Sequence, residues 1–212
     1  MNAKPVIRFH KGDLPDLKHY ENPRDKAVAI DTEALGLNNH RDRLCVVQLS
    51  PGDGSADIVQ ILKGLTQAPN IQALLADTTL TKLYHFGRFD IALLFHSFGT
   101  MSVPNYCTKI GSRLSRSYTD RHSLKNLTQE FLGIDLSKQQ QSSDWAAENL
   151  TQAQLEYAAS DVLYLHGIKQ HMDARLEREE RTDMAKACFD FLPNRCLLDL
   201  AGWNEQDIFA HS

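Results

Sequence analysis

The chain has 212 residues, of which 42% are hydrophobic and 24% charged, and its formal net charge is −4 at pH 7. The length suits one substantial domain, so we expect a single domain over residues 1–212. No stretch approaches the roughly 20 apolar residues of a membrane helix, and the first residues lack a secretory signal pattern. We therefore expect a cytoplasmic protein without a membrane partner.

The four cysteines include no CxxC pair, and this spacing argues against a structural zinc site. A disulfide framework would also be unusual in a cytoplasmic chain of this size. The negative net charge means that the chain has no overall basic surplus, which proteins that grip long nucleic acids usually have.

The first half of the chain predicts three closely spaced strands. Short apolar runs at 25–31, 44–49 and 56–61 are typical of buried strands, and a turn-rich segment joins the first two. Because the connections are short, we expect an antiparallel meander.

The rest of the chain predicts mostly helices. We expect one strand at 82–86 and helices at 70–77, 89–99, 123–133, 150–180 and 182–192, with an irregular tail after Pro193. Thr151, followed three residues later by Gln154, has the pattern of a capping box. Strands followed by alternating strands and helices indicate an α/β fold with a mixed sheet flanked by helices.

A pair of acids ends the first predicted strand. Asp31 and Glu33 are two residues apart, so their side chains point to the same face of an extended chain. Two close carboxylates in apolar surroundings repel each other, which makes their ionised forms unfavourable. A bound divalent cation would compensate this repulsion. Strand ends often carry acids, so this pair alone is weak evidence.

Three further residues complete a possible constellation. Asp90 falls in the first turn of the helix at 89–99, where the helix dipole alone would also favour an acid. Tyr157 and Asp161 are four residues apart, so they share one face of the long helix. Each segment has an ordinary structural explanation, but together they offer the oxygen ligands that hard cations prefer.

The order DTE, HFGRFD, YAASD resembles the DEDDy branch of the DnaQ-like 3′–5′ exonucleases, which have a ribonuclease H-like fold. KQQQSSDW at 138–145, followed by YAASDVLYL, is similar to bacterial ribonuclease D. Within that group the chain resembles the nanoRNase C (NrnC)-like oligoribonucleases, through HRDRLCVVQLS, HFGRFD, YTDRH, SKQQQSSDWAAE and the tail GW-x₃-DIFAHS. The resemblance covers nearly the whole chain.

This resemblance implies that Asp31, Glu33, Asp90 and Asp161 bind two divalent cations, Mg²⁺ or Mn²⁺, and that Tyr157 holds or deprotonates the attacking water. It implies a single exonuclease domain that releases nucleoside 5′-monophosphates from RNA 3′ ends, and a ring-like homo-oligomer, an octamer. The short stretch after Asp161 leaves no room for the two helical C-terminal domains of ribonuclease D. We therefore expect short RNA, down to dinucleotides, as the substrate.

Several residues are candidates for substrate contacts. Backbone N–H groups near Thr32–Leu35 and His85 would grip the terminal nucleotide, Leu35 would wedge against its base, and Phe89 would stack on it. Phosphate contacts are expected from Lys138, Gln141 and Ser142, and less strongly from Arg113 and Arg116 in a basic run at 109–125. Ordinary packing explains Leu35, His85 and Phe89 equally well, and a solvated helix face explains the basic run.

Two alternatives remain open at the level of sequence. One is the same chemistry on single- or double-stranded DNA, because contacts to the 2′-OH rather than the metal site tell the two sugars apart. The other is a catalytically silent nucleic-acid-binding module. In the tail at 193–212, Trp203 and Phe209 belong either to a local core or to contacts between subunits, and we favour subunit contacts.

Overall fold

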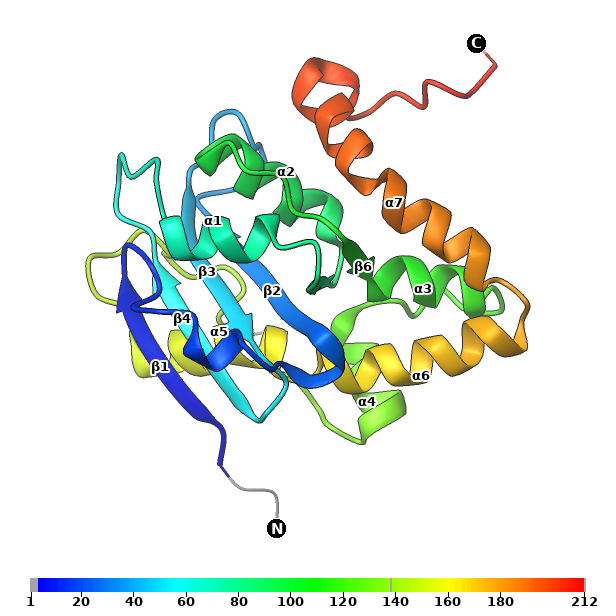
Figure 1. Cartoon of the computed structure of the whole chain (residues 1–212), viewed down its shortest axis with the longest axis horizontal. Helices are drawn as coiled ribbons and strands as arrows, with labels where there is room; N and C mark the ends of the chain where they lie inside the picture. Colours follow the sequence, from blue (N-terminus) through cyan, green and yellow to red (C-terminus); the bar gives the residue numbers. More distant parts are fainter. Residues whose placement is uncertain (1–3, 138, 212) are drawn as a thin grey trace.

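A six-stranded mixed sheet in the order β1-β4-β3-β2-β5-β6 forms the centre of the computed structural model, which describes residues 4–137 and 139–211 (Figure 1). Strands β2, β3 and β4 pair antiparallel, and the outer pairs β1–β4, β2–β5 and β5–β6 are parallel. The strands are β1 Val6–Lys11, β2 Ala27–Ala34, β3 Leu44–Ser50, β4 Ser55–Gln60, β5 Thr81–Tyr84 and β6 Asn105–Cys107. The predicted meander and the predicted mixed sheet are therefore confirmed.

Strand β1 was not predicted, and its side chains explain why. Its burial alternates between exposed and half-buried residues, and three of its six residues are basic. The guanidinium of Arg8 pairs with the buried carboxylate of Asp57, with Nε 2.7 Å from Oδ1. Tyr20 also donates a hydrogen bond of 2.7 Å to Asp57. An edge strand that is held by a carboxylate far away in the sequence shows little of the hydrophobic pattern by which strands are predicted.

Helices cover the sheet, and α2 and α5 among them pack on its central strands (Figure 1). The helices are α1 Pro69–Ala76, α2 Gly87–Phe98, α3 Thr108–Ser115, α4 Leu124–Leu132, α5 Gln152–Leu163, α6 Leu165–Arg178 and α7 Thr182–Leu198. Helix α5 begins at the predicted capping box of Thr151 and Gln154. No helix within residues 4–137 and 139–211 combines the length and apolar character needed to cross a membrane.

The prediction of one long helix at 150–180 is wrong. The chain breaks at Tyr164 into α5, which packs across β2, β3 and β4, and α6, which packs against α3 and α4. Each half keeps its own helical period, and the nearest glycine, Gly167, lies inside the first turn of α6 and not at the break. The change of packing partner therefore sets the boundary, and the sequence gives no local sign of it.

The expected end of the last helix at Pro193 is also wrong, because α7 continues through this proline to Leu198. A proline inside a helix removes one backbone hydrogen bond. Contacts beyond it offset that loss: the Cys196 side chain is fully buried, and Arg195 pairs with Asp199 one turn later. A short π-helical turn at Asp199–Trp203 follows.

An ion-pair cluster ties this C-terminal segment to the start of α2. Arg88 binds Asp199 through two hydrogen bonds, of 2.6 Å from Nε and 2.7 Å from Nη2, and also donates to the Asn204 carbonyl. Arg195 binds the same carboxylate, and the Cys196 thiol donates to the Arg88 carbonyl over 3.3 Å. Bidentate arginine–carboxylate pairs are strong and directional. The cluster therefore fixes the turn that carries Asp90.

We expect Asp199→Asn to lower the free energy of unfolding by about 1–3 kcal/mol, because two guanidinium groups lose their shared anion. The matched control is Asp190→Asn, which breaks the exposed i,i+4 pair with Lys186 on the same helix and should cost about 0.5 kcal/mol or less. Chemical denaturation of both variants measures the difference. An equal loss of unfolding free energy in the two variants would show that the cluster does not stabilise the fold more than an exposed ion pair does.

Candidate active site

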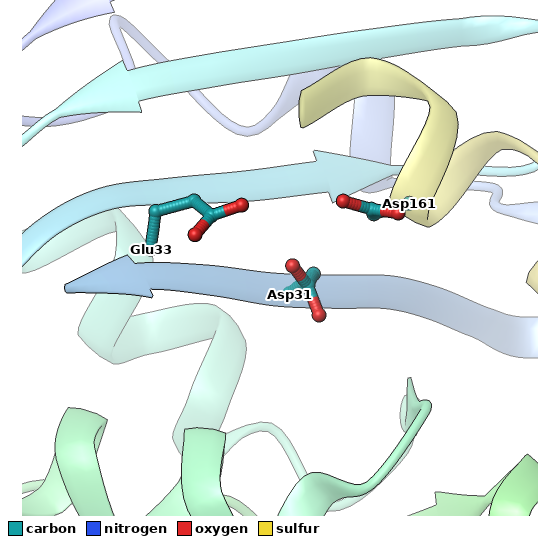
Figure 2. Close-up of side chains that lie close together, drawn as sticks. All are labelled: Asp31, Glu33 and Asp161. Carbon is teal, nitrogen blue, oxygen red and sulfur yellow. The ribbon is translucent and has the colours of Figure 1, made fainter. Parts of the chain in front are cut away.

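Three carboxylates meet at the end of strand β2 (Figure 2). Asp31 and Glu33 project from the same face of β2, as their spacing predicts, and helix α5 brings Asp161 over that face. Carboxylate oxygens of these three residues all lie within 4.8 Å of one another. The ladder between β2 and β3 fixes the register of the first two acids, because Asp31 lies opposite Gln48 and Glu33 opposite Val46.

Asp90 approaches the same point from helix α2. It lies in the first turn, as predicted, and is only 4% exposed. The hydroxyl of Thr32 donates a hydrogen bond of 2.6 Å to its carboxylate. Thr32 lies between Asp31 and Glu33 on β2, so this hydrogen bond links the fourth acid to the strand that carries the first two.

The four acids have no cationic partner: among the described residues, none of them forms an ion pair with lysine, arginine or histidine. Burial raises the pKa of Asp31, and the charges of Asp90 and Asp161 raise it further. Burial and then the charge of Asp161 raise the pKa of Glu33 to about 9. The pKa values of Asp90 and Asp161 are also raised, chiefly by burial.

These features fit a divalent cation site. Carboxylate oxygens are the ligands that Mg²⁺ and Mn²⁺ prefer. Buried acids that lack a counter-ion either take up protons or bind a metal. The set of Asp31, Glu33 and Asp161 offers at least one oxygen each within a single small volume, so the residues present suit the predicted cations.

Tyr157 lies one turn before Asp161 on α5 and is half-buried. Its ring packs in a tilted arrangement on Trp145, with ring centroids 6.0 Å apart. Burial, followed by the charges of Asp161 and Glu33, raises the pKa of its phenol. The hydroxyl therefore keeps its proton at neutral pH and can donate a hydrogen bond toward the acids.

A cavity of about 660 Å³ opens over these groups, a size within the usual range for small-ligand sites. All five predicted catalytic residues line it, and so do six of the predicted substrate contacts: Thr32, Leu35, His85, Phe89, Gln141 and Ser142. Lys138 lies outside the described residues.

Two of the lining residues have local constraints that bear on their expected roles. The Leu35 N–H donates to the Arg43 carbonyl over 3.2 Å, so this backbone donor is already satisfied, whereas the side chain is exposed at the cavity. His85 is hydrogen-bonded through Nδ1 to the Thr108 hydroxyl. Burial and then the charge of Lys109 lower the pKa of His85 to about 3, so its ring is neutral.

Arg113 and Arg116 are not among the described residues that line the cavity. Arg116 is only 1% exposed and pairs with Glu130, while its Nη1 donates to the Arg121 carbonyl over 2.7 Å. It therefore holds α3 against α4, and it does not reach the acids. Arg113 is exposed on α3. The basic run covers α3 and the turn after it, and its Arg116 pairs with Glu130 on α4, a contact outside the run that the charge pattern alone does not reveal.

Other residues line the cavity without having been predicted as site residues, namely Phe86, Lys109, Ser123, Lys125 and Trp145. Two signals pointed toward them. Phe86 belongs to the HFGRFD motif, and Lys109 opens the basic run. Phe86 and Lys109 each follow one of the parallel neighbours β5 and β6, so their place at the cavity depends on strand pairing, which is a long-range property of the fold.

Comparisons with known proteins agree with this geometry. A family model described as 3′–5′ exonuclease matches residues 16–177. Ribonuclease D of Granulibacter bethesdensis is 34% identical over 158 residues, which cover 74% of this chain and 40% of that protein. The chain thus spans about 40% of the length of this curated relative.

Two solved structures of Brucella melitensis NrnC are similar over almost the whole chain. One is bound to pGG, with a TM-score of 0.94 and 62% identity, covering 98% of this chain and 100% of that chain. The other has bound Mg²⁺, with a TM-score of 0.93, 62% identity and the same coverage.

We expect the metal-free protein to be stabilised by Glu33→Gln increasingly as the pH rises from 5 to 9. The folded-state pKa of Glu33, about 9, is higher than the value of about 4.3 expected when unfolded. When a carboxyl group has a higher pKa in the folded protein than in the unfolded chain, the folded protein becomes less stable as the pH rises through this window. Glutamine does not titrate, so the variant avoids this loss. The gain should reach at least about 1 kcal/mol, or about 2–4 °C in melting temperature.

The measurement is a series of melting curves in chelator, with Glu148→Gln, an acid outside the cavity lining, as the control. A constant difference between the wild type and Glu33→Gln across this pH range would contradict the raised pKa. In Mg²⁺ the wild type should melt at a higher temperature than Glu33→Gln, because only the wild type keeps the full set of acids.

Proposed function

Because the chain belongs to the 3′–5′ exonuclease family, we propose that it hydrolyses short oligoribonucleotides, down to dinucleotides, from their 3′ ends to nucleoside 5′-monophosphates. The observation that carries this proposal is the convergence of Asp31, Glu33, Asp90 and Asp161, with Tyr157, in one cavity. All five residues of the predicted set line this cavity. This completeness argues against a catalytically silent binding module.

The four acids would hold two divalent cations, Mg²⁺ or Mn²⁺, and the Mg²⁺ bound to the similar Brucella structure supports this choice. When bound, such ions supply an activated water and stabilise the attacking and leaving oxygens of a phosphodiester. The protein's own contribution is to hold the acids in place. Strand β2 fixes Asp31 and Glu33, the hydrogen bond from Thr32 orients Asp90, and α5 positions Asp161.

Tyr157 would orient the attacking water. Its phenol has a raised pKa, so it acts as a hydrogen-bond donor and acceptor, and proton abstraction is not its main role. Its position beside Asp161 on α5 places the hydroxyl near the acids. The packing of its ring on Trp145 restricts its rotation.

Substrate contacts follow from the remaining lining residues. Leu35 is exposed at the cavity and would wedge against the terminal base, and Phe89 would stack on that base from the first turn of α2. Gln141 and Ser142 would contact a phosphate from the loop before α5. The similar Brucella structure is bound to pGG. That ligand supports a short RNA substrate.

The C-terminal tail would mediate contacts between subunits of a ring-like homo-oligomer. It follows the turn after α7 (Figure 1), and Phe209 in it is 75% exposed although its ring centroid lies 6.1 Å from that of Phe191 on α7. Light scattering at two concentrations measures the assembly: we expect an octameric mass for the wild type and a smaller mass for Phe209→Asp. A monomeric wild type would contradict the ring.

We expect Mg²⁺-dependent cleavage of a 5′-labelled RNA dinucleotide that is faster than cleavage of longer RNA or single-stranded DNA. Chelator should abolish it, and Asp161→Asn should lower kcat/KM by at least about 100-fold, because one oxygen ligand of the metal site is lost. Unchanged far-ultraviolet circular dichroism of Asp161→Asn controls for folding.

The substrate series separates the alternatives. Preferred cleavage of DNA would replace the RNA proposal by the same chemistry on DNA. Cleavage that persists in chelator or in Asp161→Asn would contradict the metal mechanism itself.

A further inference from the structure

Gln48 is a fully buried residue whose carboxamide has no hydrogen-bond partner. It lies in β3 with none of its surface exposed. Within residues 4–137 and 139–211, neither its Oε1 nor its Nε2 forms a hydrogen bond. A buried amide without a hydrogen bond destabilises the fold, and an apolar side chain of the same shape would avoid that cost. The presence of glutamine here therefore needs a reason other than packing.

The register of the sheet places Gln48 beside the acids. It lies directly opposite Asp31 in the antiparallel ladder of β3 and β2. Opposite residues of such a pair point to the same face of the sheet, and their Cβ atoms are about 4.5–5.5 Å apart. Asp31 shares that face with Glu33 and, from α5, with Asp161. The carboxamide therefore lies under α5, on the face that carries the acid cluster.

Among the neighbours of Gln48 on the sheet, Asp31 is the one that can bind its carboxamide. On the other side of β3, Gln48 faces Ile58 of β4, which has no polar side-chain atom. Along β3 the next side chains on this face are those of Val46, which is apolar, and Ser50. The Ser50 hydroxyl already donates a hydrogen bond of 2.6 Å to a backbone carbonyl.

Helix α5, which covers this face, offers no competing partner among its buried residues. These residues are apolar except for Gln154. Gln154 forms the capping box with Thr151 at the start of the helix, and its Nε2 donates to the Asp144 carbonyl over 3.1 Å. The Asp31 carboxylate is therefore the acceptor toward which the sheet and the helix direct Gln48.

The other acids show what Asp31 lacks. Asp90 receives a hydrogen bond of 2.6 Å from the Thr32 hydroxyl, and Tyr157 lies one turn before Asp161 on α5. Asp31 receives a hydrogen bond from the backbone of Thr32, but among the described residues no side chain donates one to it. Carboxylates that bind metal ions are usually held by a hydrogen bond from a second residue, which fixes their orientation.

We propose that Gln48 is the positioning residue of Asp31 in the cation-bound site. Its Nε2 donates a hydrogen bond to the Asp31 carboxylate, and this bond orients the carboxylate for the cation. The inference rests on the proposed function, because it assigns Gln48 to the cation site of that function. It also explains the buried amide, which lowers the stability of the metal-free protein and strengthens cation binding.

This role predicts opposite effects on stability and on cation binding. Gln48→Met keeps the length of the side chain and removes both polar atoms. In chelator the variant should melt about 2–4 °C above the wild type, because the unpartnered amide is gone. Its Kd for Mn²⁺ should rise about 10- to 100-fold, the range expected when a residue that orients a metal ligand is lost. Gln48→Leu should change both quantities in the same directions.

Melting curves in chelator measure the first effect, and the electron paramagnetic resonance signal of free Mn²⁺ during a titration measures the second, both without nucleic acid. Gln60→Met is the matched control. Gln60 is a buried glutamine on the same face of β4, separated from Glu33 by Val46. Its Nε2 donates to the Ala147 carbonyl over 2.8 Å, so this variant should melt below the wild type and bind Mn²⁺ equally well.

The outcomes separate this role from the catalytic proposal, because neither measurement needs turnover. Unchanged Mn²⁺ affinity in both Gln48 variants, or an equal loss of affinity in Gln60→Met, would overturn the positioning role. Lower melting temperatures of both Gln48 variants in chelator would also overturn it, since the carboxamide would then stabilise the metal-free fold. A wild type that binds no Mn²⁺ would overturn it together with the cation site. The expected affinities without cleavage of RNA by the wild type would contradict the proposed activity and leave the role of Gln48 standing.

Discussion

The mutual repulsion of Asp31, Glu33 and Asp161 is the interaction on which the rest of the site depends. Their oxygens lie within 4.8 Å of one another, and burial removes the water that would otherwise screen them. Burial, followed by the charge of Asp161, raises the pKa of Glu33 to about 9. The fold keeps these acids together although the arrangement is unfavourable without protons or cations, and this makes the cluster a candidate for chemistry.

Rigid neighbours oppose this repulsion. Strand β2 is buried over its first four residues, and β3 beside it is buried along its whole length. Helix α5 starts at a complete capping box and packs across three strands. Helix α2 is held at its first turn by the cluster of Arg88, Asp199 and Arg195. That cluster lies partly beyond residues 16–177, which match the exonuclease family model, so the C-terminal segment also supports the site.

Local periodicity predicted which of the candidate residues share a face. A spacing of two on a strand placed Asp31 and Glu33 on one face, and a spacing of four on a helix placed Tyr157 and Asp161 together. The position of Asp90 followed from the start of a helix. These relations involve neighbours along the chain, so the sequence alone carries them.

Long-range packing produced the features that the sequence did not predict. Strand β1 is held by Asp57, 49 residues from Arg8, and the break at Tyr164 follows from a change of packing partner. Arg116 was predicted to contact a phosphate, but its side chain is buried and pairs with Glu130. Lys109 and Phe86 meet because they follow β6 and β5, which pair in parallel.

The central claim is that buried, partly protonated acids form a cation site, and proton release on Mg²⁺ binding tests it most directly. Calorimetric titration at pH 7 in two buffers with different ionisation enthalpies measures the number of protons released. Because the pKa of Glu33 is about 9, we predict a clear net release in the wild type and a smaller one in Glu33→Gln. Mg²⁺ binding without proton release, or no Mg²⁺ binding at all, would contradict the account.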